Sequence, residues 1–197
     1  MSATDPIAAH FVELAQIAQA VAHHHSNQIR DVANLVIRAL SNHNKLMFCG
    51  NGGSAADAQH LATEYVVRFG RNRSPLAAIA LTTDTSLLTA AANDFGFEQV
   101  FARQVQALGR PGDLLFLHST SGQSVNLLRA AEAARASRVT TIALLASDGG
   151  RLAAVVDHAL ILPTTNGAHA QELQLAIGHV ICGYVEASLP LPTPAAP

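Results

Sequence analysis

The chain has 197 residues, of which 49% are hydrophobic and 13% are charged, and its formal net charge is −2. This length and hydrophobic content suit one domain with a large core and argue against a disordered chain, while the near-neutral charge argues against a nucleic-acid-binding protein. The charged fraction is about half of that in an ordinary soluble protein, which predicts that copies of the chain cover much of one another's surface.

The cysteine and lysine content narrows the function classes further. Cys49 and Cys182 lie far apart in apolar stretches, which favours small core residues in a reducing compartment over a disulfide scaffold. The segment Met1–Pro6 has neither the basic nor the apolar part of a signal peptide, and no apolar run is long enough to span a membrane. We therefore expect a cytoplasmic protein. Lys45 is the only lysine, and its position excludes a Walker-type phosphate loop.

The first part of the chain, to about residue 42, is predicted to form two helices. Apolar residues recur at three- and four-residue steps over 11–21 and again over 32–40. The run His23–His25 lies between them. We interpret it as a helix end or an exposed face, because no second group of metal ligands is near it in the sequence.

From Lys45 onward, short apolar runs alternate with helical patterns. Helix-like segments cover 54–68, 96–108, 124–137 and 168–189, and the apolar runs cover 46–49, 76–81, 114–117, 140–145 and 159–162. Because the runs are continuously apolar, the pattern predicts an α/β fold with a five-stranded parallel sheet and helices on both faces. We expect a single domain over residues 1–189 and a loose proline-rich tail over 190–197.

Ligands of such a sheet bind beyond the carboxyl ends of the strands, where three polar loops follow strands, at Gly50–Ser54, Thr82–Ser86 and Ser119–Ser124. The last of these offers four hydroxyls and one glycine at the start of a helix, which favours an anion site that needs no lysine. The alternative is that the serines only cap the helix. A cap requires one hydroxyl, so we favour a phosphate site.

The loop Gly50–Ser54 is a weaker signal. Its glycines lack the spacing of a dinucleotide fingerprint, since Ala55 stands where the third glycine is needed. We expect it to bring backbone amides and the Asn51 side chain to a polar ligand.

The helix after this loop carries Asp57, His60 and Glu64. His60 and Glu64 are four residues apart and share one face, so they can offer two ligands to a divalent ion. An exposed polar pair is the commoner reason for this spacing. Gln171, Glu172 and His179 lie on the last predicted helix, where a histidine within an apolar stretch is more often structural than catalytic.

Taken in their order along the chain, these motifs resemble those of the phosphoheptose isomerases (sedoheptulose 7-phosphate isomerases) of the sugar-isomerase (SIS) domain superfamily. The resemblance runs from the first helix to Leu189. Its motifs are Cys49–Ser54, Asp57 to His60 and Glu64, Ala92–Phe97, Ser119–Gly122, and Gln171-Glu172 with His179.

The resemblance implies a flavodoxin-like three-layer sandwich, a homotetramer and an enzyme with one zinc ion per subunit. The implied reaction converts sedoheptulose 7-phosphate to D-glycero-D-manno-heptose 7-phosphate through an enediol, as the first step towards nucleotide-activated heptose. The family's metal ligands match His60, Glu64, Gln171 and His179.

Other family positions are carried over in the same way. The acid/base pair matches Glu64 and His179, with Asp57 and Gln171 in support. The sugar-phosphate contacts, which also include Glu64 and Gln171, match Asn51, Gly52, Gly53, Asn93, Asp94, Ser119, Thr120, Ser121 and Ser124.

Three neighbours depart from the family pattern and bear on sugar recognition: His118, Gln123 and His169. Two alternative functions stay open. One is a non-catalytic tetramer that acts by protein contact, as in a superfamily member that binds the bacterial replication initiator. The other is an isomerase or sensor for another sugar phosphate.

The spacing of two implied metal ligands raises a geometric question. Gln171 and His179 are eight residues apart, which is about 12 Å along a straight helix, whereas ligands of one zinc ion lie a few ångströms apart. We therefore expect either a helix break near Gly178 or ligands from different subunits, and we favour a composite site at a tetramer interface.

Overall fold

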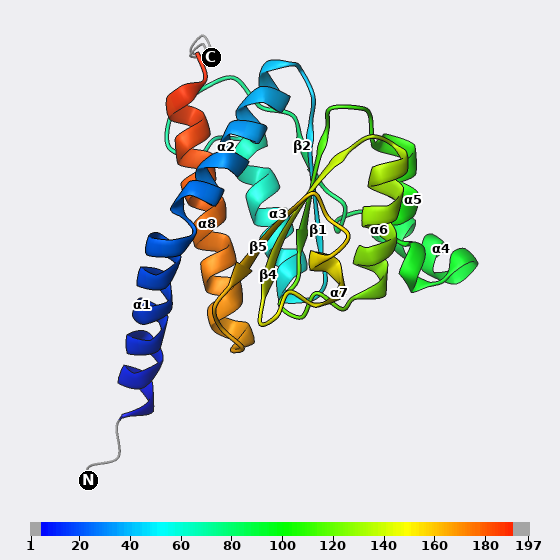
Figure 1. Cartoon of the computed structure of the whole chain (residues 1–197). Helices are drawn as coiled ribbons and strands as arrows, with labels where there is room; N and C mark the ends of the chain where they lie inside the picture. Colours follow the sequence, from blue (N-terminus) through cyan, green and yellow to red (C-terminus); the bar gives the residue numbers. More distant parts are fainter. Residues whose placement is uncertain (1–4, 191–197) are drawn as a thin grey trace.

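The computed structural model describes residues 5–190, so the predicted tail lies outside the described residues from residue 191 onward. The chain alternates strands and helices after an N-terminal pair of helices (Figure 1). The elements are α1 (Pro6–His24), α2 (Ser26–Ser41), β1 (Leu46–Gly50), α3 (Gly53–Val66), β2 (Ala78–Ala80), α4 (Thr85–Phe95), α5 (Ala102–Leu108), β3 (Leu114–His118), α6 (Val125–Ala136), β4 (Thr140–Ala146), α7 (Gly150–Ala153), β5 (His158–Leu162) and α8 (Gly167–Ser188). Among the described residues, no helix has the length and apolar character needed to cross a bilayer.

All five strands are parallel and form one sheet in the order β2-β1-β3-β4-β5. This confirms the predicted fold class. The order doubles back between β1 and β3, since the chain leaves β1 for β2 at one edge and returns to β3 on the other side of β1. Ligands of doubly wound sheets bind at such a switch point.

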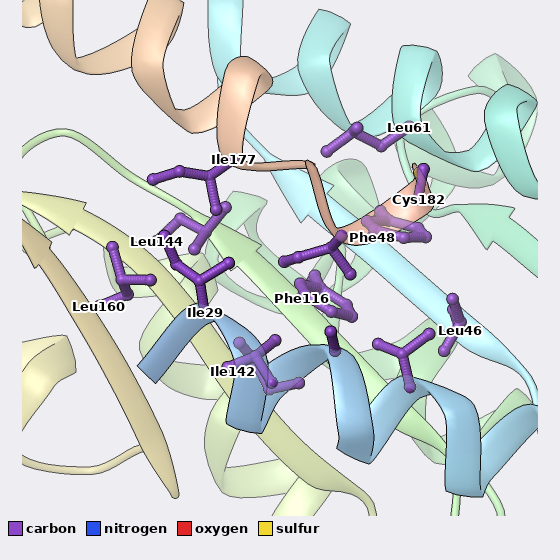
Figure 2. Close-up of a cluster of buried hydrophobic side chains, with 14 of the residues drawn as sticks. Ile29, Leu46, Phe48, Leu61, Phe116, Ile142, Leu144, Leu160, Ile177 and Cys182 are labelled. Atoms are coloured by element: carbon purple, nitrogen blue, oxygen red, sulfur yellow. The ribbon is translucent and has the colours of Figure 1, made fainter. Parts of the chain in front are cut away.

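Helices cover both faces of the sheet and create two separate cores. The first core lies between the sheet and α2, α3 and α8; Figure 2 shows Ile29, Leu61 and Ile177 from these helices meeting Phe48 and Phe116 from the strands. The second core lies between the opposite face and α5, α6 and α7. Successive strand residues feed opposite cores, which explains why every residue of β1 is buried and why the strands are continuously apolar.

The helix pattern differs from the prediction in the middle of the chain. The segment 96–108 is not one helix: Gly96, with a φ of 90°, ends α4, and a 3-10 turn at Phe97–Gln99 precedes α5. The polar stretch at Thr82–Ser86 contains the start of α4, where the Asp84 side chain accepts a hydrogen bond from the Leu87 amide at 3.0 Å. The histidine run ends α1 and forms the junction to α2, as interpreted from the sequence.

A close approach between α3 and α8 fixes the geometry of this face. The helix α8 is continuous from Gly167 to Ser188, so the break considered near Gly178 does not occur. That glycine instead faces Leu61 of α3, and a Cβ on it would lie 2.4 Å from a Leu61 methyl carbon. Gly53 at the start of α3 meets Gln171 at the start of α8, so the two helices run side by side in the same direction.

A buried ion pair ties the segment after α3 to the last turns of α8. Arg73 and Glu186 are each only 4% exposed, and the Arg73 Nε donates to the Glu186 carboxylate at 2.7 Å. The same carboxylate accepts hydrogen bonds from the backbone amides of residues 69–71 at 2.9–3.1 Å. Although burial opposes its charge, these donors lower the pKa of Glu186 to about 2.

Replacing Glu186 by Gln should lower the free energy of unfolding by about 3 kcal/mol at neutral pH, because Arg73 is then buried without its counter-charge. The ordinary pKa of this carboxyl is 4.5. The pair therefore stabilises fully above that value and loses its effect as pH falls towards 2. Urea unfolding at several pH values should show the difference between wild type and variant narrowing below 4.5.

The control is Glu132→Gln, which removes a carboxylate from a solvent-exposed pair with Arg129. This variant should unfold like the wild type. Equal effects of both substitutions, or a Glu186→Gln effect that does not change with pH, would contradict the assignment.

Candidate functional site

The loops after β1 and β3 meet at the switch point of the sheet. Gly50 of β1 pairs in register with His118 of β3, which brings the two following loops side by side. Asn51 and Asn126 then join them through two reciprocal amide hydrogen bonds of 3.0 and 2.8 Å. An open cavity of about 510 Å³ lies here, lined by Asn51, Gly52, Phe97, Glu98, Ser124, Val125 and Asn126.

The serine-rich loop, residues 119–124, contains a tight turn in which its own hydroxyls accept hydrogen bonds from backbone amides. The Gly122 amide donates to the Ser119 hydroxyl at 3.0 Å, and the Gln123 amide donates to the Ser121 hydroxyl at 3.3 Å. Gly122 has a φ of 62°, and a Cβ on it would lie 2.0 Å from a backbone oxygen of Gly149, so only glycine fits.

Ser124 is the N-cap residue of α6, yet its side chain makes no capping hydrogen bond within the described structure. Capping therefore does not account for this hydroxyl. It borders the cavity at the positive end of the α6 dipole, where an anion is favoured.

A second polar cluster lies between α3 and α8. The Nε2 atoms of His60 and His179 are 2.8 Å apart, and a Glu64 carboxylate oxygen lies 3.3 Å from the His60 Nε2. One ligand-type atom from each residue falls within 4.8 Å of the others. Two imidazoles and a carboxylate, close enough to share one ion, fit a divalent metal such as zinc and leave a fourth position open.

Asp57 and Gln171 lie towards the start of the same helix pair. One carboxylate oxygen of Asp57 is buried without a hydrogen-bond partner in the described structure, and burial raises the pKa of this group against the opposing effect of His60. The Gln171 amide lies against Gly53, about two helical turns before the level of His60 and His179. It is therefore beside the glycine loop rather than beside the histidines of its own chain.

Asn93 and Asp94 occupy the last turn of α4, where their side chains are exposed and hydrogen-bonded to each other at 2.8 Å. They do not line the cavity next to Asn51. Of the sequence-predicted contacts, Asn51, Gly52 and Ser124 border that cavity, while Gly53, Ser119, Thr120 and Ser121 belong to the two loops that form it.

Sequence reasoning missed several polar residues that build the site. Asn126 and Gln174 are both buried in helices, and the Gln174 amide donates to the Leu144 carbonyl at 2.8 Å, which holds α8 against the end of β4. A buried amide on an otherwise apolar helix face is the signal that would have revealed both.

The three departures from the family pattern lie in different surroundings. His118 is fully buried at the end of β3, and burial lowers its pKa to about 4, so the imidazole is neutral at physiological pH. Gln123 is exposed in the serine-rich loop. His169 is buried where α8 meets α1.

Comparison with known proteins agrees with this arrangement. The SIS domain family model matches residues 9–146. A phosphoheptose isomerase from Rhodospirillum rubrum is 48% identical over 91% of this chain and 91% of its own length. The solved phosphoheptose isomerase from Neisseria gonorrhoeae is 42% identical with a TM-score of 0.87, covering 92% of this chain and 97% of that one.

The solved phosphoheptose isomerase from Francisella tularensis is 36% identical with a TM-score of 0.91, covering 95% of this chain and 100% of that one. The likeness to these relatives thus extends over nearly all of each protein. The chain belongs to the SIS-domain proteins and, among them, to the phosphoheptose isomerase family of enzymes.

Proposed function

We propose that the protein isomerises sedoheptulose 7-phosphate to D-glycero-D-manno-heptose 7-phosphate in the cytoplasm, as the first step towards nucleotide-activated heptose. The observation that carries the proposal is the pairing of a lysine-free hydroxyl loop with the His60–Glu64–His179 cluster in a chain 48% identical to a phosphoheptose isomerase. These ligand-type residues favour the enzyme over the non-catalytic tetramer. Two buried, unpaired cysteines suit a reducing compartment.

The substrate lies with its phosphate at the start of α6. Hydroxyls of the serine-rich loop, namely those of Ser119, Thr120, Ser121 and Ser124, and the helix dipole bind the phosphate. Asn51, Gly52, Gly53 and Gln171 contact the sugar chain. The rise from Gly53 to His60 is about 10 Å, a length that an extended seven-carbon sugar phosphate can span.

His60, Glu64 and His179 would hold one zinc ion per subunit. Such an ion polarises a carbonyl oxygen and stabilises negative charge on it. Gln171 is two turns away within its own chain, so as a fourth ligand it would have to come from a partner subunit.

The reaction requires two proton movements that leave the protein unchanged overall. Glu64 takes the proton from C1 of the ketose and returns it to C2, and His179 moves a proton between the oxygens on C2 and C1. The intermediate between these steps is an enediol. Asp57 supports the pair from about two turns before Glu64 on α3. This assignment requires Glu64 to keep one carboxylate oxygen free for the proton.

We further propose that the working form is a homotetramer with the site at a subunit interface. Large apolar side chains are exposed on several elements, among them Phe11 at 64%, Phe97 at 60% and Val180 at 60%. Val180 directly follows His179. Asn93 and Asp94, which are exposed and do not line the cavity of their own chain, would then contact the substrate of a neighbouring subunit.

Substituting Ser121 or Ser124 by Ala should raise KM for sedoheptulose 7-phosphate roughly tenfold, because each change removes a hydrogen bond to a charged phosphate. Steady-state kinetics on the purified variants provide the measurement. Ser137→Ala at the opposite end of α6 is the matched control and should leave KM unchanged. A wild-type KM in both loop variants would rule this loop out as the phosphate site.

Substituting Glu64 by Gln or His179 by Asn should reduce kcat by a factor of about 100 or more, the usual contribution of a positioned acid or base. Circular dichroism should show that both variants remain folded. His23→Asn and Glu132→Gln, both on exposed helix faces, serve as controls. Near wild-type turnover in either site variant would remove that residue from the acid/base pair.

Dilution should lower the specific activity in step with loss of the tetramer, because a composite site exists only in the assembly. Analytical ultracentrifugation and activity assays over one concentration series compare the two quantities. Tyr184→Glu, on an exposed turn of α8, should shift both curves to higher concentration. Full activity in a zinc-loaded monomer would refute the composite site.

A further inference from the structure

The N-terminal half of α1 has little apolar contact with the rest of the chain. Ile17 and Val21 are the buried residues of this helix, and both belong to its second half. Ile7, Phe11 and Val12 are more than half exposed. Figure 1 shows α1 extending away from the sheet, so hydrophobic burial within its own chain does not fix its first turns.

A polar cluster joins this half of α1 to the first turn of α8. The His10 Nδ1 lies 3.0 Å from the His169 Nε2, and the His10 Nε2 lies 3.4 Å from a Glu172 carboxylate oxygen. Glu13, one turn after His10, brings a carboxylate oxygen to 3.7 Å from the His169 Nδ1. Two imidazoles and two carboxylates thus converge from two helices.

The central imidazole of this cluster is in an unusual position for a side chain without a ligand. His169 is fully buried, and its Nδ1 has no hydrogen-bond partner among residues 5–190. A buried polar atom left unpaired costs about 1–3 kcal/mol. A cation bound by Nε2, the ring nitrogen that faces His10, would leave the proton on Nδ1, the side of the ring where the Glu13 carboxylate lies.

We propose that His10, His169 and Glu172 form a second divalent-metal site that fastens α1 to α8. Ligand-type atoms of the three residues lie within 4.8 Å of one another, and two nitrogens with one carboxylate oxygen suit zinc, cobalt or nickel rather than magnesium or calcium. Glu13 is placed to contribute as a further ligand or to orient His169.

This site is separate from the His60–Glu64–His179 cluster. His169 and His179 are ten residues apart on the continuous helix α8, which is about 15 Å along its axis. An ion can reach it from solvent, because the side chains of His10 and Glu172 are 37% and 43% exposed. Its role is structural, since it crosslinks a weakly packed helix to the body of the protein.

Metal analysis of untagged protein separates the two sites. Chelator-treated protein is incubated with zinc, passed through a desalting column and analysed by inductively coupled plasma mass spectrometry. His60→Ala, which disrupts the first cluster, should retain about one zinc per chain. The double variant His10→Ala/His60→Ala should retain essentially none. The control His23→Ala/His60→Ala replaces an exposed histidine of α1, the helix that carries His10, and its zinc content should equal that of His60→Ala.

A second readout tests the crosslink itself. In His60→Ala protein, zinc should slow amide hydrogen exchange in the first turns of α1, and in the His10→Ala/His60→Ala variant it should not. The proposal is overturned if His60→Ala binds no zinc, or if adding His10→Ala changes neither metal content nor exchange. In either case the four side chains form only a hydrogen-bonded cluster. Because the first cluster is disabled in every arm, the result does not depend on the proposed isomerase activity.

Discussion

The contact between Gly178 and Leu61 is the constraint on which the rest of the structure depends. It lets α8 approach α3 so closely that a methyl group on residue 178 would overlap the leucine side chain. With the helices at this separation, the nitrogens of His60 and His179 come to 2.8 Å. A wider spacing would leave each histidine as an isolated surface side chain. Packing in the hydrophobic core therefore sets the chemistry on the outer side of the same helices.

The strand order supplies a second, independent constraint. Because β3 returns next to β1, the loops after both strands share one crevice, and the Asn51–Asn126 pair locks them together. The sheet thus positions the serine-rich loop, and the pair α3 and α8 positions the histidine cluster. The two are joined through α3, which begins at the glycine loop and carries His60 and Glu64.

Most of the fold could be predicted from periodicity, because buried parallel strands and their covering helices leave strong local patterns. The five strands were expected where they occur, although β2 is shorter than its apolar run. The pattern failed around residues 82–100. There Asp84 caps a helix inside a stretch that looks like a loop, and a 3-10 turn at Phe97–Gln99 replaces the first part of the segment 96–108, which looks like one helix.

The long-range polar contacts could not be predicted, because the sequence does not show which distant residues meet. Arg73 and Glu186 are 113 residues apart, and neither lies in a motif. The expectation of a helix break had a different cause. It came from the spacing of Gln171 and His179, which is too long for two ligands of one ion on a straight helix, whereas α8 is continuous and Gly178 serves close packing. Spacing pointed only to His60 and Glu64, and the family resemblance supplied Gln171 and His179 as further expected ligands. The structure adds that Gln171 and His179 lie at different levels of one unbroken helix.

That unbroken helix also restricts how the sequence can vary. Between His169 and His179, each inserted or deleted residue would rotate one cluster relative to the other by about 100° and shift it by about 1.5 Å along the axis. No loop intervenes to absorb the change. Over these residues the chain can exchange side chains but cannot change length. The number of residues between His169 and His179 therefore fixes how the two clusters are placed relative to each other, just as the side chains themselves do.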